Sequence, residues 1–154
     1  MQKDVSYGIV LLFKNTMNIF ETFLIHQLSG PHWTIPKGHP EPSDKSDVET
    51  ALRELKEETG YSLSPADLFD TNTKFSTSYE YYHAKKKIQI HKTNIYFLAF
   101  VGEHMRHEEK PKLQECEVDE ATWLNFEDAK QKVTFESDKQ LIKEVEKFIE
   151  HSKL

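Results

Sequence analysis

The sequence reads Arg53-Glu54-Leu55-Lys56-Glu57-Glu58-Thr59-Gly60-Tyr61 across the segment that decides the fold. On a helix, Glu54, Glu57 and Glu58 are three or four residues apart, so their carboxylates lie on one side. Like charges at these spacings repel one another and destabilise an isolated helix. Divalent cations would offset the repulsion, because hard metals such as Mg²⁺ bind carboxylates together with substrate phosphates. The alternative is a solvent-facing acidic surface. If the three glutamates were the only observation, this alternative would be the favoured interpretation.

The residues on either side of this segment predict a complete helix and the loop that leads into it. Ser46 and Glu49 have the spacing of a capping box, which predicts the helix start, and Gly60 predicts its end. An apolar face, roughly opposite the glutamates, consists of Val48, Leu52 and Leu55. The segment from Lys37 to Asp44 contains one glycine and two prolines, so it is predicted to be a loop.

The rest of the chain predicts strands and a second helix. Strands are expected at Val5 to Phe13, Ile19 to Leu28, Trp33 to Ile35, Asp67 to Ser78, Ile88 to Val101 and Ala121 to Phe126. Tyr79 to Lys87 has the composition of a hairpin tip, and Glu103 to Gln114 that of a charged loop. Ser137 and Gln140 repeat the capping-box spacing before an amphipathic terminal helix. This order predicts a mixed sheet covered on both faces.

Length, charge and cysteine content set broad limits on the protein. A chain of 154 residues fits one domain, residues 1–154. The net charge of −6 gives no chain-wide attraction to long nucleic acid or an anionic membrane, so local lysines and metal ions must meet a polyanionic substrate. Cys116 is the one cysteine, which excludes an internal disulfide. The apolar run from Tyr7 to Phe13 is too short to span a membrane, and a cytoplasmic protein is expected.

The segment from Gly38 to Tyr61 resembles the Nudix box. That box is a glycine, five residues, a glutamate, seven residues, and then Arg-Glu-apolar-x-Glu-Glu-x-Gly-apolar. The second half matches in full, whereas the first half carries one extra residue. Counting forward from Gly38 places Asp44 at the box glutamate, and counting back from Arg53 places Lys45 there.

The resemblance implies an α/β Nudix fold, an α/β/α sandwich with a mixed central sheet. It implies Glu57 and Glu58 as the main metal ligands and Glu54 as a further ligand or the general base. The carbonyl of Gly38 is a further candidate ligand, and Mg²⁺ is the expected ion, with Mn²⁺ as an alternative. Glu117 precedes Trp123 by six residues, the spacing of a glutamate that often completes the site, so it is a second candidate base and ligand. Arg53 is placed to pair with Glu57 or orient it.

Three further segments resemble one branch of the family, the asymmetrical diadenosine tetraphosphate hydrolases. They are Trp33 to His39, Tyr82-His83-Ala84-Lys85, and Lys92 to Ala99. The resemblance implies hydrolysis of diadenosine tetraphosphate to ATP and AMP. It implies base stacking by two tyrosines and phosphate binding by basic residues; the substrate-binding candidates are Lys37, His39, Tyr82, Lys85, Lys92 and Tyr96.

Two other functions stay open on the sequence. Another Nudix pyrophosphohydrolase would act on a capped or triphosphorylated RNA end, a nucleotide sugar or a diphosphoinositol phosphate. A non-catalytic Nudix module would bind a nucleotide without cleaving it, but such a module is expected to lose its metal carboxylates, and all three glutamates are present. No residue pattern identifies an oligomeric state, and a monomer is compatible with the sequence.

Overall fold

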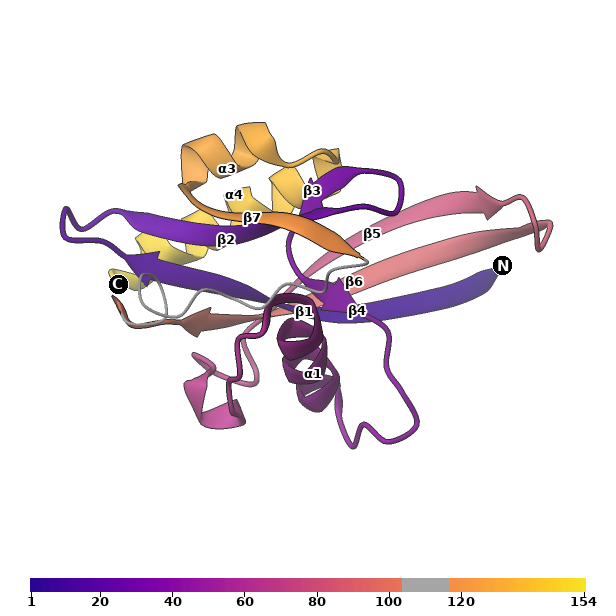
Figure 1. The fold of residues 1–154 in the computed structure, drawn as a ribbon, viewed down its shortest axis with the longest axis horizontal. Helices are drawn as coiled ribbons and strands as arrows, with labels where there is room; N and C mark the ends of the chain where they lie inside the picture. Colours follow the sequence, from indigo (N-terminus) through magenta and orange to yellow (C-terminus); the bar gives the residue numbers. More distant parts are fainter. Residues whose placement is uncertain (104–116) are drawn as a thin grey trace.

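The computed structural model describes residues 1–103 and 117–154, which form three layers around one mixed sheet (Figure 1). The strand order is β3-β2-β1-β6-β5, with β4 also paired to β1 and β7 to β2. The strands are β1 (Gln2–Lys14), β2 (Phe20–Gln27), β3 (His32–Thr34), β4 (Lys37–Gly38), β5 (Lys74–His83), β6 (Ile88–Phe100) and β7 (Val118–Asn125). β1 and β6 pair in parallel, whereas the other pairs are antiparallel.

Helices cover both faces of this sheet. Helix α1 (Asp47–Thr59) lies on one face, and α3 (Phe126–Lys132) and α4 (Glu136–Ser152) lie on the other (Figure 1). A short 3₁₀ turn, Pro65–Asp67, follows α1. The predicted α/β/α sandwich with a mixed central sheet is therefore confirmed. No helix in the described residues is long and apolar enough to cross a membrane.

The sheet is buried on both faces, so its central strand contributes to two separate cores. Ile9 and Leu11 of β1 pack in the core under α1, whereas Val10 and Leu12 pack in the core under α3 and α4. This division follows from the alternation of side chains along a strand. It explains why the sequence of β1 is a continuous apolar run and not an alternating one.

The ends of α1 agree with the sequence prediction. The hydroxyl of Ser46 accepts a hydrogen bond from the Glu49 amide at 3.1 Å. Gly60 ends the helix in the left-handed conformation, with φ of 82°, and its amide donates to the Lys56 carbonyl at 2.8 Å. Both ends therefore form through local hydrogen bonds that satisfy backbone groups at the helix termini.

Several other predicted boundaries were wrong. Phe135, not Ser137, is the N-cap of α4, and its carbonyl accepts from two amides of the first turn. Helix α3 was missed, although Asn125 caps it by accepting from the Asp128 amide at 2.8 Å. The segment predicted as a hairpin tip is strand from Tyr79 to His83, with the turn confined to residues 84–87. β4 lies within the predicted loop. Most of the predicted charged loop, with Cys116, lies outside the described residues.

The register of the central strands decides which side chains share a face. Lys92 of β6 lies between Asp4 of β1 and Tyr79 of β5. Side chains directly opposite one another in paired strands point to the same face. These three residues therefore share the face covered by α4, whereas Tyr82 points to the other face. The consequence is a line of polar and aromatic side chains beside the start of α4.

Candidate active site

Gly38 of β4 lies directly against the Glu54 side chain of α1. A Cβ atom added at Gly38 would lie 2.0 Å from the Glu54 carboxyl carbon, so only glycine allows this approach. The Glu54 side chain is 15% exposed, and burial is the main cause of the raised pKa of its carboxyl. The predicted ligands Gly38 and Glu54 are thus brought into contact.

Glu58 is the most buried of the box glutamates, at 5% exposure. It accepts hydrogen bonds from the Gln27 side chain and the Lys37 backbone amide. Burial, followed by the nearby charge of Glu54, raises the pKa of Glu58 to about 8. One carboxylate oxygen, Oε2, is buried without a hydrogen-bond partner among the described residues. A buried, unpaired carboxylate oxygen is costly, and a cation is the usual compensation.

These residues fit a divalent cation. The charge of Glu54 raises the pKa of Glu58, and the charge of Glu57 raises the pKa of Glu54. Glu57 presents a half-exposed carboxylate one turn along the helix from Glu54. Oxygen donors alone make up this set, which suits Mg²⁺ or Mn²⁺ and not a thiolate-preferring metal. The carbonyl of Gly38 would add a neutral oxygen beside Glu54.

Arg53 links the loop to the carboxylates on the helix. Its guanidinium donates to Glu57 at 3.0 Å, to Glu54 at 3.1 Å and to the His39 carbonyl at 2.8 Å. It also donates to Asp44 through Nε and Nη2, both at 3.0 Å. The predicted pairing of Arg53 with Glu57 is present in the structure, and Asp44 accepts more hydrogen bonds from Arg53 than Glu57 does.

Asp44 occupies the position that the sequence left uncertain. Its Oδ2 accepts from the Glu41 amide at 2.8 Å and the Thr50 hydroxyl at 2.9 Å. The hydrogen bond from Arg53 is the main reason that the pKa of Asp44 lies well below its usual range. The extra residue therefore leaves the carboxylate at Asp44, where it orients Arg53 and closes the loop.

Replacing Arg53 with lysine is expected to lower kcat/KM by roughly 10- to 100-fold, the range found when groups that orient metal ligands are lost. A lysine ammonium has no planar fork and cannot hold Asp44, Glu57 and the His39 carbonyl together. Steady-state kinetics would measure the change, with Lys56→Arg, an exposed change on the same helix, as the control. Activity within two-fold of wild type in Arg53→Lys would contradict this role.

The raised pKa of Glu58 predicts a pH-dependent affinity for metal. A carboxyl with a pKa of about 8 is protonated at neutral pH in the metal-free protein, and metal binding must displace that proton. Mg²⁺ is therefore expected to bind more tightly as pH rises from 6 to 8. Its binding should release a proton at pH 6, and less of one at pH 8. Calorimetric titrations in two buffers of different ionisation enthalpy would measure both effects. Glu58→Gln should flatten the pH dependence; an unchanged slope would contradict the assignment.

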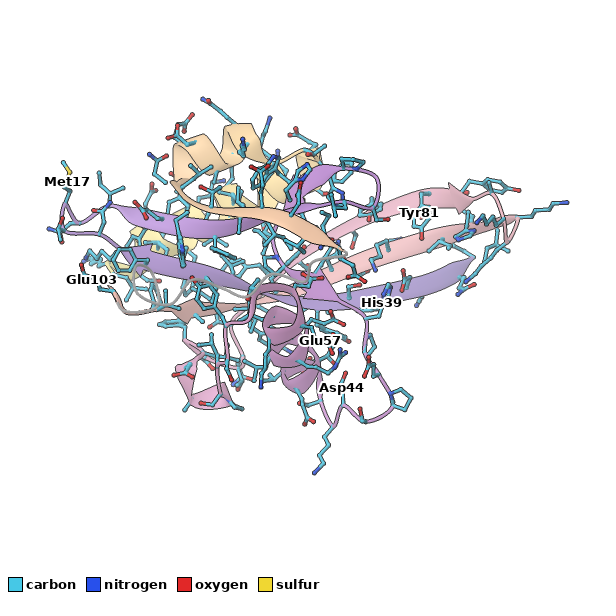
Figure 2. The ribbon with its side chains drawn as sticks, viewed as in Figure 1. Met17, His39, Asp44, Glu57, Tyr81 and Glu103 are labelled. Carbon is cyan, nitrogen blue, oxygen red and sulfur yellow. The ribbon has the colours of Figure 1, made fainter. Side chains whose placement is uncertain are left out.

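Beside this acidic site lies a cleft of about 560 Å³ on the α4 side of the sheet. It is lined by Asp4, His32, Thr34, Lys37, His39, Tyr79, Tyr81, Lys92, Asn94, Phe135, Glu136, Ser137 and Asp138. Lys37 joins the cleft to the box, because its amide contacts Glu58 while its side chain faces the cleft. In Figure 2, His39 lies between the strand that carries Tyr81 and the helix that carries Glu57.

One end of the cleft gathers basic groups. Lys92 is almost fully buried, and its ammonium donates to Ser6 and, at 3.1 Å, to Asp4. His39 Nε2 lies 2.9 Å from Asp4 Oδ1 and 3.2 Å from Lys92 Nζ. Burial lowers the pKa of Lys92, and Asp4 opposes that effect. The predicted phosphate-binding residues Lys37, His39 and Lys92 are therefore brought together.

The other predicted substrate-binding residues are not part of this cleft. Tyr96 is fully buried, so its ring offers no face to a base, and the predicted stacking role is wrong for this conformation. Tyr82 is 60% exposed but points to the opposite face of the sheet, and Lys85 lies in the hairpin turn. Neither lines the cleft. The tyrosines that line it are Tyr79 and Tyr81, whose ring centroids are 6.1 Å apart.

The profile of the NUDIX domain matches residues 3–145 of the chain. The chain is a member of the Nudix family. As a Nudix hydrolase it acts on phosphoanhydride bonds, and enzymes of this family typically depend on a divalent metal.

Two relatives of this Nudix hydrolase bear on its substrate. Over 129 residues it is 36% identical to the asymmetrical bis(5′-nucleosyl)-tetraphosphatase of Rattus norvegicus, covering 82% of this chain and 80% of the relative. Over 115 residues it is 30% identical to the mRNA-decapping protein g5R of African swine fever virus, covering 68% of this chain and 42% of the relative. A crystal structure of a C. elegans Ap4A hydrolase binary complex matches with a TM-score of 0.73 at 21% identity, covering 96% and 98% of the two chains.

The position of Glu117 in the Nudix hydrolase leaves its predicted role open. It is exposed at the start of β7, and its carbonyl accepts from the Leu28 amide at 2.8 Å. Leu28 follows Gln27, whose side chain contacts Glu58, so the Glu117 backbone lies beside the end of β2 that reaches the box. Its roles as ligand and base stay predictions.

Sequence reasoning missed Asp4, Tyr79, Tyr81 and Asp138 as residues of the Nudix cleft. Tyr79 could have been predicted once the hairpin turn was placed, because side chains alternate along a strand and the odd-numbered residues of β5 then share a face with Lys92. Asp4 and Asp138 come from opposite ends of the chain, and no local pattern connects them to Lys92.

Proposed function

We propose that this enzyme cleaves dinucleoside polyphosphates, with diadenosine tetraphosphate as the favoured substrate and ATP and AMP as products. The observation that carries the proposal is one cleft that holds both basic and aromatic side chains: Lys37 lies next to Glu58, and Tyr79 lies directly opposite Lys92. A polyphosphate chain needs cations along its length, and each adenine needs flat apolar surface. The 36% identity to the rat tetraphosphatase supports the same choice.

Glu54, Glu57 and Glu58, with the Gly38 carbonyl, would hold Mg²⁺ or Mn²⁺. The ion, when bound, neutralises phosphate charge and lowers the pKa of a coordinated water. Lys37, His39 and Lys92 bind the remaining phosphates. Arg53 keeps Glu54 and Glu57 in place, and Glu54 or Glu117 accepts the water proton. The water oxygen bonds to phosphorus as the bridging P–O bond breaks, and the departing nucleotide leaves as a phosphate anion. Positioning and charge stabilisation carry most of the rate gain.

The aromatic side chains of the cleft would hold one adenine. Tyr79 and Tyr81 line one wall of the cleft, and Phe135 lies across from them on the α4 side beside His32, at 5.1 Å between ring centroids. Tyr79 and Tyr81 are both more than a third exposed, so their rings are available for stacking.

Tyr79→Ala is expected to raise KM for diadenosine tetraphosphate by roughly 5- to 100-fold, since stacking on one base contributes about 1–3 kcal/mol. Tyr82→Ala is the matched control, because Tyr82 is more exposed but lies on the other face of β5. Steady-state kinetics on both variants would measure the difference. A larger effect in Tyr82→Ala would restore the sequence-based assignment and refute this one.

The function is tested by incubating the protein and Mg²⁺ with diadenosine tetraphosphate in ¹⁸O-water and separating the products by mass spectrometry. ATP and AMP, with the label in one of them, would support the proposal and identify the attacked phosphorus. Two ADP molecules would mean symmetrical cleavage. No turnover would refute the proposed substrate. A cytoplasmic location, where nucleotides and Mg²⁺ are abundant, and action as a monomer are part of the proposal.

A capped RNA end is the second candidate substrate. Two observations favour it. One is the similarity to a viral mRNA-decapping protein. The other is three consecutive lysines, Lys85 to Lys87, in the turn of the β5–β6 hairpin (Figure 1), whose two strands line the cleft. Basic residues along a path from the cleft would bind successive phosphates of a single strand. A higher kcat/KM on capped RNA than on diadenosine tetraphosphate, lost when the three lysines become alanine, would favour this candidate.

A further inference from the structure

A buried carboxyl group lies in the wall of the cleft that also holds the basic side chains. Asp138, in the first turn of α4, is 4% exposed and lines the cleft. Its Oδ2 accepts a hydrogen bond from the Thr34 hydroxyl at 3.0 Å. No basic side chain in the described residues forms an ion pair with it, although the charges of Lys37 and His32 lower its pKa against the larger effect of burial, which raises it. Asp4 in the same cleft is paired with Lys92 at 3.1 Å, whereas Asp138 has no such partner, so this part of the cleft suits a hydrogen-bond donor of the ligand better than its phosphates.

A second buried acceptor lines the same cleft. Asn94 is 2% exposed, and its amide nitrogen donates to the Thr77 hydroxyl at 3.2 Å. Its Oδ1 is buried and has no partner among the described residues. The amide of Asn94 has two N–H donors, and the Thr77 and Tyr79 hydroxyls accept from them, so only an acceptor is left for a ligand. Buried polar atoms without partners are uncommon in proteins and often mark ligand contacts.

Aromatic side chains enclose these acceptors. The Tyr79 hydroxyl hydrogen-bonds with Asn94, and Tyr81 continues the same wall. Phe135 lies three residues before Asp138, and His32 lies two residues before Thr34. The group that suits this space is flat, so that it stacks, and carries N–H donors at its edge, so that it pairs with both acceptors. Adenine has this form, because its exocyclic amino group presents two N–H donors.

We propose that Asp138 and Asn94 select the nucleobase, by accepting hydrogen bonds from the exocyclic amino group of adenine. This inference rests on the proposed function, since it assigns the part of the cleft beside Tyr79, Tyr81 and Phe135 to a nucleoside. Hypoxanthine is the informative comparison. It replaces the amino group with a carbonyl oxygen, which would face two acceptors and repel them.

The test is calorimetric binding of ATP and ITP, with Mg²⁺, to the wild-type protein, since ATP is a product of the proposed reaction and its binding is measured apart from turnover. ATP is expected to bind about ten-fold or more tightly than ITP, because a site built to pair with a ligand's donor rejects the analogue that lacks it. Asp138→Asn, added to this protein, is expected to bring the ratio close to one, because its amide accepts and also donates. Asn94→Ala should weaken ATP and leave ITP unchanged.

Glu136→Gln is the matched control, because it removes an exposed carboxylate from the same helical turn and the same cleft. It should leave the ATP/ITP ratio unchanged. Equal binding of ATP and ITP by the starting protein would overturn the proposal, as would a ratio that survives in Asp138→Asn. Thermal melts confirm that each variant is folded. Selective ATP binding without turnover of diadenosine tetraphosphate would refute the proposed reaction and leave the base assignment standing.

Discussion

Glu58→Gln is expected to lower kcat by roughly a hundred- to a thousand-fold or more, the range found when one charge-stabilising group is removed from an active site. Glutamine keeps the size of the side chain and its contacts with Gln27 and Lys37, so the fold should persist. What disappears is the negative charge that the bound metal requires. Turnover of diadenosine tetraphosphate over a range of Mg²⁺ concentrations would measure the loss, with Glu49→Gln, an exposed carboxylate on α1, as the control.

The same variant has an opposite effect on stability. The pKa of Glu58 is raised in the folded protein, so its contribution to stability is fully present below the unfolded value of 4.5 and is lost as pH rises through about 8. Glutamine does not ionise, and the metal-free variant should therefore melt at a higher temperature than metal-free wild type at pH 9. Activity close to that of wild type would remove Glu58 from the metal site. A lower melting temperature at pH 9 would contradict its burial as an unpaired carboxyl.

Gly38→Ala is the second change with a large expected effect, a fall in kcat/KM of roughly 100-fold, since displacing a catalytic group by about 1 Å is that costly. The added methyl group would lie 2.0 Å from the Glu54 carboxyl carbon, so the carboxylate must move. Stability should change little, because the displaced atoms are the end of a flexible side chain. Kinetics and thermal melts on the same preparation would separate the two effects.

Gly30→Ala provides the reverse pattern as a control. Gly30 has φ of 57°, and nothing lies within 4 Å of an added Cβ atom. Alanine there is expected to cost about 1 kcal/mol of stability through backbone strain alone. Its kinetics should match wild type. An equal loss of activity in both variants would mean that the Gly38 effect is a general consequence of destabilisation.

The part of the site that depends on local sequence was predictable. Helix α1, its ends and the contacts of Arg53 arise from residues within about one helical length of one another, and capping and periodicity identify them. Asp44 shows the limit of counting along a motif. Two alignments were possible, and only the loop geometry selects the residue that reaches Arg53.

The cleft was less predictable, because it depends on strand register and depth. The hairpin between β5 and β6 decides that Tyr79, not Tyr82, faces Lys92, and a change of one residue in register would reverse that choice. Tyr96 points to the same face of β6 as Lys92 but is fully buried in the core. Asp138 joins the cleft only when α4 packs on the sheet, and no pattern within α4 indicates that contact.

The parallel pairing of β1 with β6 also determines when the two halves of the site form. Asp4 and Lys92, which contact each other in the cleft, are 88 residues apart in sequence. Closing a loop of that length is slower than forming local contacts, whereas α1 needs only neighbouring residues. During synthesis, the carboxylate helix is complete well before the ribosome has added β6. The nucleotide cleft is therefore expected to be among the last parts of the protein to form, and ligand binding to report the final step of folding.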